Sequence, residues 1–233
     1  VGSEMCIRDR YGGAKDARTI DRKTYYDYPR AYKMIDELQP QAVIFSDGGP
    51  GCRWVGNENG FAGATNWSFL RAGEVYPGYP KYRELQYGHA DGNQWVAAEC
   101  DVSIRPGWFY HPEEDDKVKT VDQLTDLYYR SVGHNATLLL NFPVDRNGLI
   151  HPTDSLNAVS FHLRVQKELA DNLLSSAKVS ASDERGGQFK VRAVTDGKYD
   201  TYWATNDGVT TADLTFTFSQ PTKMNRVMIQ EYI

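Results

Sequence analysis

The stretch Trp95-Val96-Ala97-Ala98-Glu99-Cys100-Asp101-Val102-Ser103-Ile104 decides the fold class of this chain. Apolar side chains occupy alternate positions along it, which is the pattern of a β-strand with one apolar face. An aromatic loop, residues 105–112, follows directly. Thr120 then begins a helical pattern, and Gln123 stands where it completes a capping box. We therefore expect a strand, a loop and a helix in that order.

Strands and helices alternate on both sides of this stretch. Ala42-Val43-Ile44-Phe45 is an apolar run that predicts a buried strand, and Leu138-Leu139-Leu140 predicts another. Helices are expected over residues 24–38, where Pro29 either lies near the true start or kinks the helix, and over residues 154–173. This repetition predicts an α/β fold with parallel strands.

The loops and the last helix refine the fold class. Elaborate segments follow the strands, whereas the returns from helix to strand are short, as in a TIM barrel. Because only three strands are expected, we predict the C-terminal half of a (β/α)8 TIM-like barrel. The apolar positions of the last helix should face inward; they are Leu156, Val159, Leu163, Leu169 and Leu173.

Three parts are expected along the chain. Residues 1–10, VGSEMCIRDR, resemble adapter sequence translated at the end of a gene fragment, and we predict a non-native tail there. Residues 11–174 would form the partial barrel. Residues 175–233 show no helical pattern and predict the start of a β-sandwich, with strands expected at 177–182, 213–218 and 225–232.

Composition excludes some functions and leaves others open. The formal net charge of −5 argues against a nucleic-acid partner, which would need a basic face. The chain has no run of about 18 apolar residues, so we expect no membrane span. Its fifteen Tyr and five Trp suit a carbohydrate site, although an aromatic core explains them equally well. The three Cys have neither disulfide nor zinc-site spacing, and no metal site is expected in the first 175 residues.

Glu58 is the candidate catalytic group. It follows the first predicted strand, in a loop that also carries Trp54, Asn57 and Trp67. Glycoside hydrolysis needs two carboxyl groups, one of which stays protonated near neutral pH through burial or a neighbouring charge. A loop Glu among tryptophans suits that role, but on its own such a residue is more often a solvated surface group.

Five further residues are candidates for binding substrate or orienting the catalytic group, each with a structural alternative. Arg53 either binds a sugar hydroxyl or forms a structural salt bridge. Trp108 either stacks on a sugar or serves as a core or lid aromatic residue. Glu99 either orients a catalytic group from the barrel interior or is a buried, paired structural acid, and we place Asp101 on the opposite face of that strand. His111 and His89 each either bind substrate or are plain surface histidines.

Oxygen ligands gather in the predicted β region. Asp196-Gly197-Lys198-Tyr199-Asp200 and Asn206-Asp207 offer carboxylate and amide oxygens in tight turns. They permit calcium binding, but ordinary Asp-Gly turn chemistry is the commoner explanation. No other cofactor is expected.

Three segments resemble glycoside hydrolase family 29, the α-L-fucosidases. They are Pro40–Asp47 with Arg53-Trp54-Val55-Gly56-Asn57-Glu58-Asn59-Gly60, Ala98–His111, and Leu138-Leu139-Leu140-Asn141-Phe142-Pro143. The subgroup resembled acts on branched α-1,3/1,4-linked fucose. Residues 196–204 resemble a discoidin-like (F5/8 type C) β-sandwich, a module that can bind carbohydrate.

The resemblance implies a retaining exo-α-L-fucosidase that acts on fucosylated oligosaccharides or glycoconjugates. Glu58 matches the general acid/base, and we add Trp54 of the same segment as a candidate for binding substrate. The nucleophilic Asp of the family lies in a Trp-Phe-Asp-Gly-like segment upstream of Tyr11 that this sequence lacks. We therefore expect the chain to be inactive alone, and a non-catalytic carbohydrate-binding protein is the alternative. Family habit indicates a periplasmic or secreted bacterial protein.

Overall fold

The computed structural model describes Asp21 and residues 23–230. The chain divides into two compact units, one up to Arg164 and one from Val165 onward. The predicted tail over residues 1–10 lies outside the described residues. The predicted domain limits at residues 11, 174 and 175 remain predictions.

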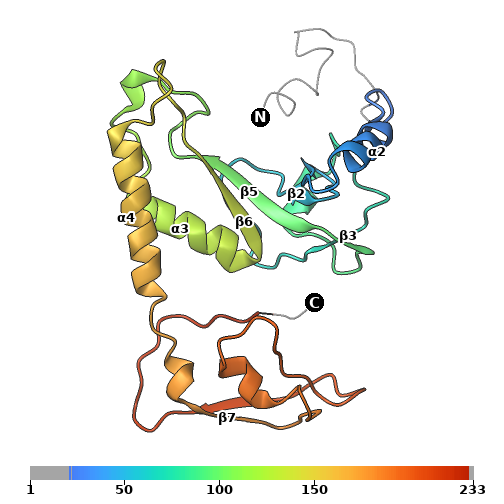
Figure 1. Ribbon diagram of the computed structural model, residues 1–233, viewed down its shortest axis with the longest axis vertical. Helices are drawn as coiled ribbons and strands as arrows, with labels where there is room; N and C mark the ends of the chain where they lie inside the picture. Colours follow the sequence, from blue (N-terminus) through green and yellow to red (C-terminus); the bar gives the residue numbers. More distant parts are fainter. Residues whose placement is uncertain (1–20, 22, 231–233) are drawn as a thin grey trace. The chain divides into compact units, whose positions relative to one another are not determined.

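A four-stranded parallel sheet forms the centre of the first unit (Figure 1). The strands run in the order β1 (Phe45–Ser46), β2 (Cys52–Trp54), β5 (Ala97–Ser103) and β6 (Ala136–Asn141). The expected α/β arrangement is confirmed. Whether these strands form half of a barrel remains a prediction.

Strand β2 is absent from the sequence prediction, which treats residues 47–93 as a loop. Only residues 47–51 separate it from β1, whereas a parallel pair usually needs a crossover of about a dozen residues. A glycine makes the short connection possible, because a Cβ on Gly51 would lie 2.7 Å from the Ile44 backbone nitrogen. The amides of Gly51 and Cys52 both donate to the Ile44 carbonyl, at 3.0 and 3.1 Å.

The remaining part of that long segment is ordered by short elements. Strands β3 (Phe69–Leu70) and β4 (Gln94–Trp95) pair antiparallel, and η2 (Tyr82–Gln86) is a 3-10 helix between them. Five buried residues form its core: Leu70, Val75, Tyr79, Leu85 and Val96.

The helices begin close to their predicted positions. Helix α2 (Tyr28–Leu38) has Pro29 in its first turn, so this proline lies near the start and does not kink the helix. Helix α3 (Val121–Ser131) carries the predicted capping box. Gln123 N donates to Thr120 Oγ1 at 3.3 Å, and Thr120 N donates to Gln123 Oε1 at 2.9 Å. Two further 3-10 turns flank α3, namely η3 (Pro112–Glu114) and η4 (Val132–His134).

Helix α3 covers one face of the sheet, beneath β5 and β6 in Figure 1. Val102 and Ile104 pack there against Leu124 and Leu127, with Leu138 partly buried beside them. Burial of each such side chain contributes about 1.5–3 kcal/mol. This apolar layer fixes the strands whose carboxyl ends carry the candidate site.

Helix α4 (Pro152–Glu168) disagrees with its predicted orientation. The helix ends at Glu168, before the predicted end at residue 173, so Leu169 and Leu173 lie outside it. All five residues expected to face inward are exposed, from 38% at Leu173 to 65% at Leu156. The helix contacts α3 through Phe161, whose ring centroid lies 6.1 Å from that of Tyr128. At 100° per residue, Val159 and Leu163 lie about 200° around the helix from Phe161, so they point away from that contact.

The second unit contains one antiparallel pair, β7 (Lys178–Ala181) with β8 (Leu214–Thr217). Two 3-10 helices, η5 (Leu173–Ser176) and η6 (Val191–Thr195), are absent from the prediction. The predicted strand over 225–232 is wrong where it can be checked, since residues 225–230 form no strand and Val227, Met228 and Ile229 are 74–89% exposed. A strand needs a neighbour for its backbone groups, which these exposed residues do not have in the described chain.

Candidate active site

Two loops meet at the carboxyl edge of the parallel sheet. The loop after β2 carries Glu58, and the loop after β5 carries Trp108. Trp108 Nε1 donates to Glu58 Oε2 at 3.0 Å, which joins residues 50 positions apart. Since β2 and β5 are parallel neighbours, their following loops emerge at the same edge. The structure thus joins two residues that the sequence singles out from separate motifs.

The Trp108 loop is held by polar contacts on several sides. Asn141 Nδ2, at the end of β6, donates to Ser103 Oγ at 3.1 Å and to the Trp108 carbonyl at 3.2 Å. Arg105 is fully buried, and its guanidinium donates to both carboxylate oxygens of Asp154 at 2.8 and 2.9 Å. Hydrogen bonding to Asp154 raises the pKa of Arg105. These contacts fix the start of the loop, and with it the position of Trp108.

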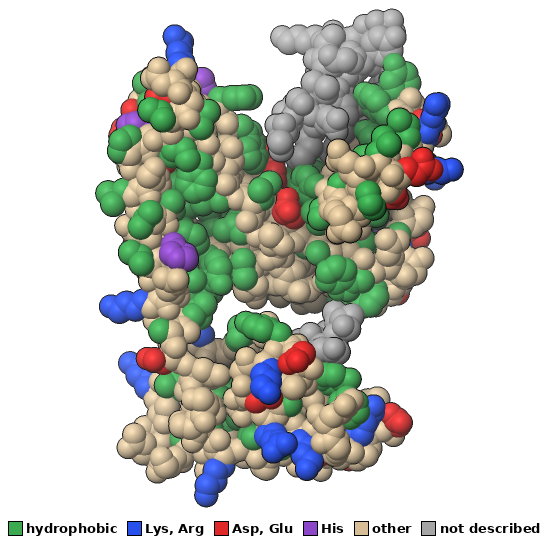
Figure 2. Space-filling model, viewed as in Figure 1, with side chains coloured by type: hydrophobic (Ala, Val, Ile, Leu, Met, Phe, Trp, Pro, Cys, Tyr) green, Lys and Arg blue, Asp and Glu red, His purple; other side chains and the backbone are tan. Residues whose placement is uncertain are grey.

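Two acidic side chains line the sheet face opposite α3. Glu99 Oε2 accepts from Cys52 Sγ at 3.7 Å, and Asp101 Oδ1 accepts from Trp54 Nε1 at 2.7 Å. The expectation that Glu99 and Asp101 point to opposite faces is wrong, because residues two positions apart on a strand share a face. Acidic side chains lie in the hollow of this unit near β2 (Figure 2).

Burial sets the protonation of these two acids. It raises the pKa of Asp101 to about 6; the hydrogen bond from Trp54 opposes this shift, and the charges of Glu58 and Glu99 add to it. Burial also raises the pKa of Glu99, against the hydrogen bond from Cys52. Asp101 therefore titrates close to neutral pH, in electrostatic contact with Glu58.

Arg53 has a structural position. Its side chain is fully buried, and burial lowers its pKa to about 10. It donates to four protein oxygens, which are Leu85 O at 3.2 Å, Val96 O at 2.6 Å, Asn66 Oδ1 at 2.5 Å and Trp67 O at 2.7 Å. Direct sugar contact does not fit this burial. The structural alternative fits better, although the partners are neutral oxygens and not the carboxylate of a salt bridge.

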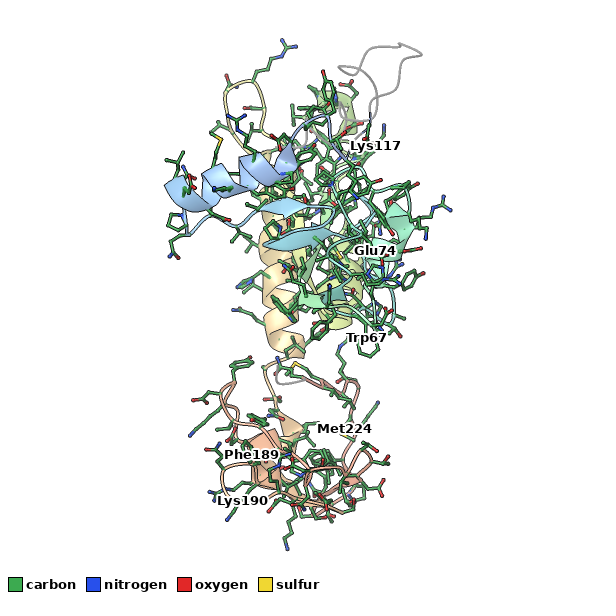
Figure 3. The ribbon with its side chains drawn as sticks, turned by 90° about the vertical axis from the view of Figure 1, so that its right-hand side faces the viewer. Trp67, Glu74, Lys117, Phe189, Lys190 and Met224 are labelled. Carbon is green, nitrogen blue, oxygen red and sulfur yellow. The ribbon has the colours of Figure 1, made fainter. Side chains whose placement is uncertain are left out.

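The other tryptophans separate in space. Trp54 is half-buried and stacks on Tyr82 with ring centroids 6.2 Å apart. Trp67 follows Asn66, whose side chain donates to the carbonyls of His134 and Asn135 just before β6. Trp67 therefore lies near the amino edge of the sheet, at the far end of the unit from Lys117 (Figure 3). It does not flank Glu58, whose side chain is exposed and not enclosed by tryptophans.

The two histidines have different surroundings. The residue His111 is exposed, and its carbonyl accepts from Arg105 Nη1 at 3.4 Å. His89 is 6% exposed, and its Nδ1 accepts from Arg71 N at 3.1 Å, so the surface interpretation of His89 is wrong. His111 remains a candidate for binding substrate.

The carboxylate of Asp196, a possible calcium ligand, accepts hydrogen bonds within its own turn. Its Oδ1 accepts from Lys198 N at 2.9 Å and its Oδ2 from Thr201 Oγ1 at 2.8 Å. The backbone hydrogen bond from Lys198 lowers the pKa of Asp196. Within Asp21 and residues 23–230, no group of three or more His, Cys, Asp or Glu is arranged to hold a metal ion. Helices in that same part of the chain are too short or too polar to cross a membrane.

Three participants escape the sequence prediction. Asp101 could have been placed beside Glu99 from the sequence, because it lies two positions away on the same predicted strand. Asn141 has a weaker one, because it ends the third predicted strand. Tyr82 has none, since no sequence pattern connects it with Trp54 across 28 positions.

Comparison with known proteins identifies similar sequences and folds. No family model matches the chain. Alpha-L-fucosidase 1 of Arabidopsis thaliana is 38% identical over 229 residues, which cover 95% of this chain and 44% of that protein. A solved glycoside hydrolase 29 family member from an unknown rumen bacterium is 47% identical, with a TM-score of 0.66, over 76% of this chain and 31% of its own.

A second solved structure contains a sugar. The Ruminococcus gnavus GH29 fucosidase in complex with fucose is 29% identical to this chain, with a TM-score of 0.73. The match covers 88% of this chain and 42% of that one. The chain spans less than half the length of the curated relatives it matches.

The comparisons correct the prediction of a periplasmic or secreted bacterial protein. The curated relatives that match come from Oryza sativa and Arabidopsis thaliana, so a bacterial origin is not supported, and nothing in the described residues shows secretion. The mixed α/β fold is similar to that of GH29 fucosidases. This chain is therefore similar to α-L-fucosidases and to solved members of glycoside hydrolase family 29.

Proposed function

We propose that this chain supplies the general acid/base, Glu58, of a retaining exo-α-L-fucosidase that removes terminal α-L-fucose from fucosylated glycans. The observation that carries the proposal is the hydrogen bond from Trp108 to Glu58, which brings two family-like motifs into one site. The name of the Arabidopsis relative and the fucose complex of the Ruminococcus gnavus protein support the substrate class.

Glu58 acts twice in the proposed mechanism. It first protonates the glycosidic oxygen as the aglycone leaves and the fucosyl group bonds to the nucleophile, and it then removes a proton from the water that releases fucose from the fucosyl-enzyme. Trp108 orients the carboxyl group through its indole N–H and offers an apolar ring face to the sugar. The second carboxylate, the nucleophile, is expected upstream of Tyr11. Neither Glu99 nor Asp101 is assigned that role.

The proposal also includes the domain organisation and the substrate specificity of the chain. Residues 11–174 would be the C-terminal half of a (β/α)8 barrel, and residues 175–233 the start of a discoidin-like sandwich. The polar sheet face would then line the barrel interior, with Glu99 orienting catalytic groups. The α-1,3/1,4-fucosidase subgroup is the expected specificity, and Trp54 and His111 are proposed substrate contacts.

The test requires a product of the same gene that includes the sequence upstream of Tyr11. This product should hydrolyse an aryl α-L-fucoside, and NMR should show that the first product retains the anomeric configuration. Glu58→Gln should lower the rate by about 10²–10⁴-fold. Glu74→Gln is the matched control, because Glu74 is an exposed acid of the same unit, 3.7 Å from Arg71 (Figure 3). Equal rates for the two variants, or an inverted product, would contradict the proposal.

Carbohydrate binding without catalysis is the second candidate. Exposed aromatic rings favour it, because a flat ring can stack on a sugar; Trp67 is 44% and Phe109 78% exposed. A 2-fluorofucosyl fluoride separates the two functions, because it accumulates a covalent adduct on a nucleophilic Asp. Mass spectrometry of the longer gene product should show that adduct if the protein is a retaining fucosidase. Binding of fucosylated glycan with no adduct and no turnover would favour the binding protein.

A further inference from the structure

The rings of Trp54 and Tyr82 form a stacked pair beside the candidate site. Trp54 ends strand β2, and Tyr82 begins the 3-10 helix η2. Their ring centroids lie 6.2 Å apart with an interplanar angle of 21°. Trp54 is half-buried, whereas Tyr82 is 41% exposed. The pair therefore presents aromatic surface to solvent a few residues from Glu58.

Both rings are held in place from below. The indole N–H of Trp54 donates to Asp101 at 2.7 Å, and Asp101 is only 5% exposed. The backbone after β2 also presses against η2, since a Cβ on Gly56 (φ +77°) would lie 2.1 Å from the Tyr82 carbonyl oxygen. A buried polar anchor and this close backbone approach keep the pair from rearranging freely.

The surroundings of the pair suit a sugar ring. A flat aromatic face attracts the weakly positive C–H groups on one side of a pyranose. Three carboxyl groups, those of Glu58, Glu99 and Asp101, lie near the Trp54 end. The exposed Glu58 and the half-buried Glu99 can accept hydrogen bonds from hydroxyl groups. Tyr82 lies at the other, more exposed end. A bound glycan would therefore run from the carboxyl groups, past Trp54, to the exposed ring of Tyr82.

We propose that Trp54 and Tyr82 form a subsite for the pyranose ring to which the fucosyl residue is attached. This inference rests on the proposed fucosidase function. The fucosyl residue lies toward the carboxyl groups, and the next ring stacks along the aromatic pair with Tyr82 at its outer end. The subsite selects a fucosylated oligosaccharide over free fucose.

Titration calorimetry on the 233-residue chain tests the subsite with three ligands: free fucose, a fucosylated disaccharide, and the same disaccharide without fucose. The wild-type chain should bind the fucosylated disaccharide about 3- to 10-fold more tightly than fucose, the range expected for one aromatic contact. Tyr82→Ala should abolish that difference. Tyr82→Phe should preserve it, because the ring and not the hydroxyl makes the contact.

Tyr87→Ala is the matched control, because Tyr87 is a 52% exposed tyrosine just after the same 3-10 helix. It should leave the difference intact. The subsite is overturned if Tyr82→Ala keeps the wild-type affinity for the fucosylated disaccharide, or if Tyr82→Phe loses as much of that affinity as Tyr82→Ala. It is also overturned if the wild-type chain binds the fucosylated disaccharide no more tightly than fucose. In the last case, fucose binding still stands. Binding of the bare disaccharide that depends on Tyr82, without fucose binding, would keep the subsite and overturn the fucosidase assignment.

Discussion

The two faces of the parallel sheet differ in what their buried side chains do. On one face, Val102 of β5 and Leu138 of β6 pack against helix α3. On the other, Glu99 and Asp101 of β5 meet side chains of β2. Alternate residues of one strand thus pack against the helix or carry an acid, which is possible because successive side chains point to opposite faces.

Two buried charged residues make the same comparison more sharply. Arg53 donates to four neutral oxygens, so four of its five N–H groups bond within the protein. Asp101 receives one side-chain hydrogen bond, from Trp54, and burial raises its pKa, with a further contribution from the charges of Glu58 and Glu99. A satisfied buried charge indicates a structural role. A buried acid with a shifted pKa beside other acids indicates a functional one.

Replacement of Arg53 should have the largest effect on stability. Arg53→Met leaves several buried acceptors without donors, each costing about 1–3 kcal/mol, so the unfolding free energy should fall by about 3–5 kcal/mol. Urea denaturation measures this loss. Arg83→Ala, which removes an exposed arginine of η2, should cost less than about 0.5 kcal/mol. A stable Arg53→Met variant with weakened sugar binding would instead restore the substrate-binding interpretation.

Asp101→Asn should change stability in a pH-dependent way. The folded chain raises the pKa of Asp101 from 3.8 to about 6, so it favours the protonated carboxyl. That contribution is complete below about pH 4 and is lost as pH rises through about 6. The unfolding free energy of the variant, relative to that of the wild type, should therefore rise by up to about 3 kcal/mol between pH 4 and pH 7.

Asp145→Asn supplies the opposite sign as a control. Backbone hydrogen bonding from Leu149 lowers the pKa of Asp145, so its contribution is present above the ordinary pKa and is lost as pH falls. The unfolding free energy of that variant, relative to that of the wild type, should fall as pH rises. Parallel pH profiles for the two variants would show that burial does not govern Asp101.

Neighbouring leucines of β6 test the two faces directly. Leu138 packs in the cluster on α3, whereas Leu139 is 41% exposed on the face that carries the acids. Leu138→Ala should cost about 2–3 kcal/mol and Leu139→Ala less than about 1 kcal/mol. Thermal or urea unfolding distinguishes them. Equal losses would mean that the polar face is packed as tightly as the apolar one.

The smallest predicted effect concerns the indole of Trp108. Trp108→Phe keeps a ring but removes the donor to Glu58, so fucoside hydrolysis by the longer gene product should fall about 5- to 10-fold. Phe109→Ala changes an adjacent ring that is 78% exposed and should leave the rate close to wild type. A larger loss for Phe109→Ala than for Trp108→Phe would contradict the proposed orientation of Glu58.

Local patterns predict the elements well and their partners poorly. The capping box of α3 and the alternation along β5 are local signals, and both elements form where expected. Strand β2 is three residues long and follows a glycine loop, so it has no period to detect. The inward face of α4 fails for a different reason, because the pattern marks an apolar stripe without saying what covers it.

The same limit applies to the candidate site. Glu58 and Trp108 can be chosen from the sequence because each stands in a distinctive loop, but their hydrogen bond depends on parallel pairing of β2 with β5. The role of Arg53 depends on carbonyls contributed by residues up to 43 positions away. The stacking of Tyr82 on Trp54 likewise depends on tertiary structure alone.

The central step of the proposed mechanism is the transfer of a proton from Glu58 to the leaving group. The direct measurement compares Glu58→Gln and wild type, in the longer gene product, on α-L-fucosides of graded leaving-group basicity. The hydrolysis rate of the variant should fall most on substrates with poor leaving groups and little on fucosyl fluoride, whose departing fluoride needs no proton. An unchanged dependence on the leaving group, whatever the overall rate, would contradict this proton transfer.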